Sequence, residues 1–208
     1  MRCSKPSGSG CCMLGCREAI SAAKPMTTDI DVMVVLDVLH IPDLDAYRAV
    51  VERLGHTERA CGFICGRAEL AAWNPCEIWQ LVHDTRDCFG ALAPLVPSYT
   101  TEDIRNQVKS GVGNLYHELC HRHIHSAVPN DGEALRSAYK AVFYLLQNLY
   151  FLRTGEYVRQ KRELAERLRG NDREVLLTAM RLRTQPAEYD PEVFSRLFTW
   201  CQDTLHTV

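Results

Sequence analysis

The fold of this chain is decided by the stretch Met26-Thr-Thr-Asp29-Ile-Asp31-Val-Met-Val-Val-Leu36. Its apolar, β-branched part has the length and composition of a buried strand. Because side chains alternate along a strand, Asp29 and Asp31 point to the same side. Paired carboxylates at the start of a buried strand are costly unless they are neutralised, and Mg²⁺ is the usual neutraliser where phosphates also bind. We therefore predict a Mg²⁺ site at Asp29 and Asp31, with a solvated pair as the alternative.

The composition is that of a globular protein. The chain has 208 residues, of which 46% are hydrophobic and 24% are charged, with 24 basic against 26 acidic side chains. This balance argues against a disordered chain and against nucleic-acid binding by bulk positive charge. We expect one large domain or two smaller ones.

Neither a membrane span nor a secretory signal is visible in the sequence. The densest apolar run, 141–152, contains Gln147 and Asn148 and is shorter than the roughly 18 residues that a span needs. The opening MRCSKPSGSG has no apolar core, so we expect a cytoplasmic protein without membrane partners. The ten cysteines are expected to be mostly free thiols, and five of them are expected to be buried small hydrophobes: Cys11, Cys12, Cys16, Cys61 and Cys65.

The pattern along the chain predicts two domains after a flexible tail at residues 1–10. Residues 11–97 alternate between strand-like and helix-like segments, with a further strand at 60–65 and helices at 43–54 and 75–81. Residues 98–208 are predicted to be a helical bundle. Its helices begin near Thr100 and extend over 134–152, 157–169, 173–182 and 191–205. The predicted fold class is therefore α+β, with a mixed sheet flanked by helices and followed by a bundle.

A short motif precedes the acidic pair at a fixed spacing. Leu14-Gly15-Cys16 is followed by twelve residues and then by Asp29-Ile-Asp31-Val32. This resembles the signature of the DNA polymerase β-like (minimal) nucleotidyltransferase superfamily, although that superfamily usually has Ser or Gly where Cys16 stands. The segments 62–90 and 150–161 also look like parts of a small bacterial nucleotidyltransferase domain and the helical domain that follows it.

The resemblance implies a function and a set of site residues. Gly15 and Cys16 would form a turn that binds the phosphates, Thr28 would form its rim, and Asp29 and Asp31 would hold Mg²⁺, in a two-metal arrangement. The implied reaction moves a nucleoside monophosphate from an NTP to a hydroxyl of a small molecule or protein. The alternative is a catalytically silent binding module that keeps the fold.

The superfamily's third carboxylate has no counterpart in the predicted strand 60–65. Glu69, Glu77 or Asp84 could replace it as the base that deprotonates the attacking hydroxyl. An acid could also be introduced on the strand itself. Cys61 and Gly62 lie on opposite faces of it, and Gly62 is expected to be the less disruptive position because it has no side chain to displace.

A second motif competes with the first. His117-Glu118-Leu-Cys-His121 matches HExxH and lies in a predicted helix, where the two histidines could bind Zn²⁺ and Glu118 could activate a water. No further histidine motif follows, and Glu133, Glu156 and Glu163 compete equally as a third ligand. A zinc hydrolase is therefore the third hypothesis. Ordinary surface histidines are the favoured interpretation of this motif.

Two residues of the helical half are candidates for the substrate side of the site. Tyr157 and Lys161 are four residues apart in a predicted helix, and Lys161 could contact a phosphate. A solvated lysine is the favoured alternative. The stripe of Tyr139, Phe143, Leu146 and Tyr150 is predicted to be core.

Overall fold

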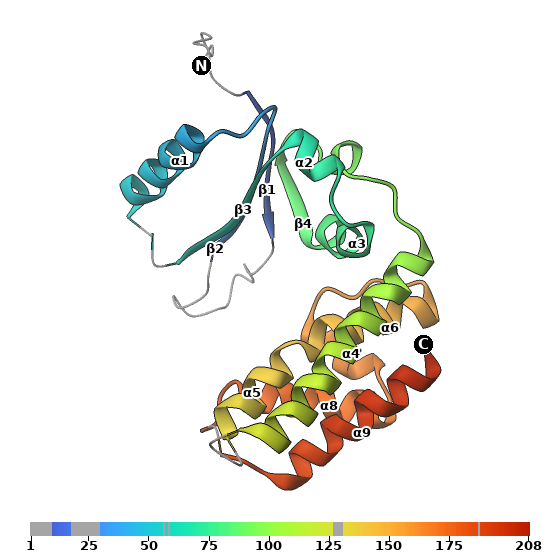
Figure 1. Ribbon diagram of the computed structural model, residues 1–208. Helices are drawn as coiled ribbons and strands as arrows, with labels where there is room; N and C mark the ends of the chain where they lie inside the picture. Colours follow the sequence, from blue (N-terminus) through green and yellow to red (C-terminus); the bar gives the residue numbers. More distant parts are fainter. Residues whose placement is uncertain (1–9, 18–29, 56, 58, 127–130, 187) are drawn as a thin grey trace. The chain divides into compact units, whose positions relative to one another are not determined.

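The computed structural model describes residues 10–17, 30–55, 57, 59–126, 131–186 and 188–208 (Figure 1). The chain divides into two compact units, Met1–Tyr99 and Thr100–Val208. In the described ranges no helix is long and apolar enough to cross a membrane.

The first unit is built on a four-stranded mixed sheet in the order β3-β2-β1-β4. Strands β2 and β3 are parallel, and β1 is antiparallel to both β2 and β4. The predicted strand at the acidic motif is confirmed as β2. The elements are β1 (Cys11–Arg17), β2 (Ile30–Leu36), α1 (Ile41–Leu54), β3 (Ala60–Gly66), α2 (Arg67–Ala71), α3 (Pro75–Asp84), β4 (Thr85–Phe89) and the 3₁₀ turn η1 (Ala93–Leu95).

Helices cover the two faces of this sheet unequally, with α1 on one face and α2 and α3 on the other (Figure 1). Met33 and Val35 of β2 are fully buried on the α2–α3 face, where they form the core of the unit. Helix α1 contributes no buried residue and lies on the opposite face, where Val34 is buried. Because β2 alternates, Asp31 lies on the same face as Met33 and Val35. The core cluster comprises Met13, Met33, Val35, Cys65, Leu70, Ile78, Leu92 and Leu95.

The turn that was expected at Gly15 and Cys16 is instead part of strand β1. Both residues lie inside a strand that is paired on both sides, with Gly15 opposite Met33 of β2 and Asp87 of β4. A Cβ at Gly15 would stand 2.5 Å from side-chain carbons of both Met13 and Thr85. The structure thus explains the glycine by close packing in the sheet rather than by a tight turn.

The second unit is entirely helical in its described part. Helix α4 begins with a capping box, in which the Thr100 hydroxyl accepts from Asp103 N and the Asp103 carboxylate accepts from Thr100 N at 2.7 Å. The helices are α4 (Thr101–His125), α5 (Gly132–Lys140), α6 (Val142–Thr154), α7 (Lys161–Arg167), α8 (Gly170–Leu182) and α9 (Pro191–Thr207). The predicted helix over 134–152 is therefore two helices, separated at Ala141.

The bundle core follows the predicted apolar positions. Tyr139, Phe143 and Leu146 are buried, as predicted, and Tyr150 is half-buried. Two buried polar side chains tie the core to the backbone: Tyr139 donates to Val193 O and Gln147 donates to Val158 O, both at 2.8 Å. The buried face of α4 consists of Ile104, Val108, Val112, Leu115 and Leu119.

Gly62 on β3 is not the tolerant position that the sequence suggested. It is opposite Val32 in the register, and a Cβ there would stand 2.4 Å from Val32 O. The same Cβ would lie 3.4 Å from the Tyr47 hydroxyl of α1, so Gly62 lies on the α1 face, away from Asp31. An aspartate at Gly62 would both disturb the sheet and point to the wrong face.

We expect Gly62→Ala to lower the free energy of unfolding by about 1–3 kcal/mol, because backbone must move to accept the methyl group. Gly113→Ala is the matched control, because nothing lies within 4 Å of a Cβ at this position in α4. That change is expected to stabilise the chain by about 0.5–1 kcal/mol. Urea unfolding followed by circular dichroism measures both, and equal stability of the two variants would contradict this description of the β2–β3 contact.

Candidate functional site

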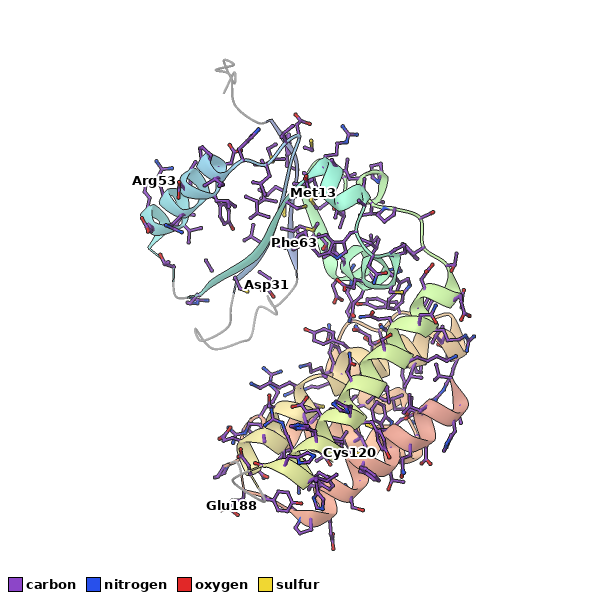
Figure 2. All side chains as sticks on the ribbon, in the orientation of Figure 1. Met13, Asp31, Arg53, Phe63, Cys120 and Glu188 are labelled. Carbon is purple, nitrogen blue, oxygen red and sulfur yellow. The ribbon has the colours of Figure 1, made fainter. Side chains whose placement is uncertain are left out.

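Asp31 lies at the end of the sheet where β2 begins (Figure 2). The registers place it opposite Cys61 of β3 and Arg17 of β1, and Arg17 is in turn opposite Thr85 of β4. Asp31 is half-buried, so its carboxylate is accessible. The other predicted residues of this end, Thr28 and Asp29, lie outside the described residues.

The residues paired across this end of the sheet, which are Cys61, Asp31, Arg17 and Thr85, form a row that offers few metal ligands. Asp31 is the only carboxylate in this row. The residue beside it on β3 is Cys61, whose sulfur is a soft donor that suits zinc or copper(I) better than Mg²⁺. In the part of the chain that the structure describes, no three His, Cys, Asp or Glu side chains are grouped to hold a metal ion. The described residues thus fit Mg²⁺ through Asp31 alone, and a second oxygen ligand must come from elsewhere.

The three substitute carboxylates are not equivalent in the structure. Glu69 folds against Gly66, which stands five residues along β3 from Cys61, about 16 Å at the usual rise of a strand. The Glu77 carboxylate accepts a hydrogen bond from Trp73 Nε1 at 2.8 Å. Asp84 ends α3 directly before Thr85, which belongs to the same row as Asp31. Of these three residues, Asp84 therefore lies at the correct end of the sheet.

The sequence did not reveal that a carboxylate also lies on β4. Asp87 is opposite Gly15, two residues further into the sheet than the row of Asp31, and its Oδ1 accepts from Leu92 N at 3.4 Å. It is exposed. The only available signal was the short stretch Thr85-Arg-Asp-Cys-Phe89, which carries too few apolar residues to predict a strand.

Cys16 and Asp31 lie on opposite faces of the sheet. Cys16 is opposite Val32, the neighbour of Asp31, and successive residues of a strand point to opposite faces. Its sulfur accepts a hydrogen bond from the Cys88 thiol of β4 at 3.5 Å. Burial, followed by this hydrogen bond, raises the pKa of the Cys16 thiol. The structure therefore places the Cys16 side chain near the same end of the sheet as Asp31 but on the other face.

The expectation that the cysteines are buried is correct for only part of the set. The nine described cysteines are all free thiols, and Cys65 is buried as expected, but Cys11 and Cys61 are exposed. Burial raises the pKa of Cys65 to about 11 and that of Cys201 to about 12. These two thiols remain protonated at neutral pH and act as core side chains.

The HExxH motif lies on α4, and among the described residues no further ligand joins it to form a zinc hydrolase site. The rings of His117 and His121 are 6.0 Å apart between centroids, but Glu118 Oε1 accepts from Arg122 Nε at 2.8 Å. The expected third ligands are paired with arginines. Glu133 binds Arg136, and Glu156 and Glu163 both bind Arg167.

Tyr157 and Lys161 do not form the predicted pair on a helix face. The helix begins only at Lys161, because the chain leaves α6 at Gly155, which is left-handed at φ 74°, and Gln147 then binds Val158 O. Lys161 Nζ lies over the Phe143 ring, 4.8 Å from its centroid. This contact explains Lys161 as part of the bundle.

The chain was compared with protein families, curated proteins and solved structures. No protein-family model matches the chain, and no curated protein matches it. A solved structure of the spectinomycin adenyltransferase AAD(9) from Enterococcus faecialis, with ATP and spectinomycin, is similar with a TM-score of 0.58 and 12% sequence identity. The match covers 95% of this chain and 92% of that chain. The chain therefore shares the fold of that adenyltransferase. The fold class and the resemblance seen in the acidic motif are therefore confirmed at the level of the fold.

We predict that exposed thiols react with iodoacetamide before buried thiols do. At about pH 8, iodoacetamide should modify Cys61 and Cys11 in the native protein and leave Cys65 and Cys201 unmodified. A raised pKa keeps a thiol protonated until the pH approaches that value, so protection should persist up to about pH 9. Peptide mass spectrometry measures this, and labelling of Cys65 as fast as Cys61 would contradict the described core.

Proposed function

We propose that this protein is a nucleotidyltransferase that moves a nucleoside monophosphate from an NTP to a hydroxyl of a small molecule. The observation that carries the proposal is the fold shared with AAD(9) over nearly the whole chain, with Asp31 at the start of a central strand. AAD(9) was solved with ATP and spectinomycin, so ATP is the first nucleotide to test. Use of an NTP also fits the cytoplasmic location that we expect.

Asp31 and Asp29 are the proposed Mg²⁺ ligands. Asp29 precedes Asp31 by two residues, so an extended chain places both carboxylates on the same side. When bound, Mg²⁺ would neutralise charge on the triphosphate and on the leaving pyrophosphate. A role for Gly15, Cys16 and Thr28 in holding the phosphates stays a prediction.

The proposed reaction needs a base for the acceptor. The hydroxyl oxygen forms a bond to the α-phosphorus, the bond from that phosphorus to the bridging oxygen breaks, and pyrophosphate leaves with its electron pair. The hydroxyl proton passes to a carboxylate. We assign this role to Asp84, the last residue of α3, which directly precedes β4. Strand β4 is two strands from β2 in the sheet order, about 10 Å, and this separation leaves room for substrate atoms.

One observation favours the silent binding module as the second candidate. Cys61 occupies the position on β3 directly beside Asp31, where an acid would be close enough to share a metal with it. A module of this kind would bind nucleotide and turn over little. Binding and turnover must therefore be measured separately.

We expect Mg²⁺ with ATP to raise the thermal midpoint of the protein by about 5 °C or more at a hundredfold excess over Kd, because the ligand binds only the folded state. Asp31→Asn should remove this shift. Asp45→Asn is the matched control, because this side chain is 69% exposed and belongs to α1, which covers the face of the sheet opposite to that of Asp31. GTP, CTP and UTP should be screened in the same way.

A shift of equal size in Asp31→Asn would place the nucleotide elsewhere. If none of the four nucleotides raises the thermal midpoint, both the enzyme and the silent binding module are ruled out. A shift without pyrophosphate release would favour the module.

We also expect Cys61→Asp to raise nucleotidyl transfer, because it places a carboxylate beside Asp31 on the same face of the sheet. A well-placed base is worth about 10²–10⁴-fold in rate, which is the upper limit for this gain. Cys61→Asn is the matched control without charge. Pyrophosphate release measures the rate.

If Asp84 already supplies the base, Asp84→Asn abolishes turnover in the natural chain and Cys61→Asp restores part of it. Unchanged turnover in Asp84→Asn would contradict the role that we assign to this residue.

A further inference from the structure

Three histidines form a line along the last turns of α4. His117, His121 and His125 are spaced four residues apart, so they share one face of the helix, and all three are exposed. The ring centroids of His117 and His121 are 6.0 Å apart, whereas those of His121 and His125 are 5.0 Å apart. The closer pair is therefore one turn beyond the HExxH motif.

The closer spacing is the one that a metal chelate requires. A metal at 2.0–2.1 Å from one nitrogen of each imidazole lies about 3.2 Å from each ring centroid. A tetrahedral angle at the metal then separates the two centroids by about 5 Å. His121 and His125 have this separation, whereas the rings of His117 and His121 would have to approach each other by about 1 Å.

The surroundings of the pair permit a cation. Arg122 is the nearest positive neighbour in the sequence, and its charge is compensated by Glu118 at 2.8 Å. His123 points elsewhere and stacks on Phe194 of α9, with centroids 5.2 Å apart, so it does not compete for the metal. No third side chain from the described residues completes the set, and water must fill the other positions.

We propose that His121 and His125 form a two-imidazole chelate for a divalent transition metal of the nickel, copper or zinc class. Imidazole nitrogen is a preferred donor for these ions, and carboxylate-rich sites suit Mg²⁺ instead. With only two protein ligands the ion exchanges readily, so it neither holds the fold together nor serves a hydrolase. The chelate joins two successive turns of folded helix, and metal binding therefore stabilises the end of α4.

The test is a calorimetric titration of the untagged full chain with Ni²⁺ alone. We expect one saturable site per chain, weakened at least about tenfold by His121→Ala and by His125→Ala. His117→Ala should change Kd by no more than about twofold. His206→Ala on α9 is the matched control, because residue 202, one turn before it, is glutamine. His125→Gln repeats the test with a residue that keeps the side chain long and favours helix.

Three outcomes would overturn the proposal. One is no saturable binding up to about 1 mM Ni²⁺, which corresponds to less than about 4 kcal/mol of binding free energy. Another is a loss of Ni²⁺ affinity in His117→Ala as large as the loss in His125→Ala, which would assign the metal to the HExxH pair, His117 and His121. The third is an equal loss in His206→Ala, which would indicate non-specific binding.

Discussion

The alternation of side chains along β2 is the constraint on which the rest of the first unit depends. Met33 and Val35 must point into the core under α2 and α3, and this requirement fixes the direction of every other residue of the strand. Asp31 consequently lies on the core face but at the open end of the sheet. A shift of one residue in the register would turn Val32 to the core face and turn Met33 and Val35 away from it.

The same alternation decides which neighbours can act with Asp31. In the parallel pair, Cys61 is beside it and Gly62 is turned to the other face. In the antiparallel pair, Gly15 shares its face and Cys16 does not. The chemistry at this end of the sheet is thus set by the pairing of three strands, and the acidic motif supplies only one part of it.

The sequence was sufficient wherever a local pattern carried the information. The β-branched run of β2, the helix start near Thr100 and the core positions Tyr139, Phe143 and Leu146 were all predicted and are all found. Strands β1 and β4 were missed because Cys, Gly, Arg and Asp have no strong preference for strands, and these segments are strands only through pairing with their neighbours. The faces of Cys16 and Gly62 depend equally on contacts between strands, and the pairing of Glu156 with Arg167 joins residues that lie eleven apart in the sequence. The predicted Asp29 and Thr28 lie outside the described residues.

The central claim is that the end of the sheet at Asp31 holds the triphosphate of a nucleotide. A crystal structure of the protein with Mg²⁺ and a non-hydrolysable ATP analogue tests it directly. We predict density for the phosphates beside the start of β2, with a metal ion coordinated by the Asp31 carboxylate. Phosphates bound away from this end of the sheet, with the Asp31 carboxylate in contact only with protein and water, would contradict the account.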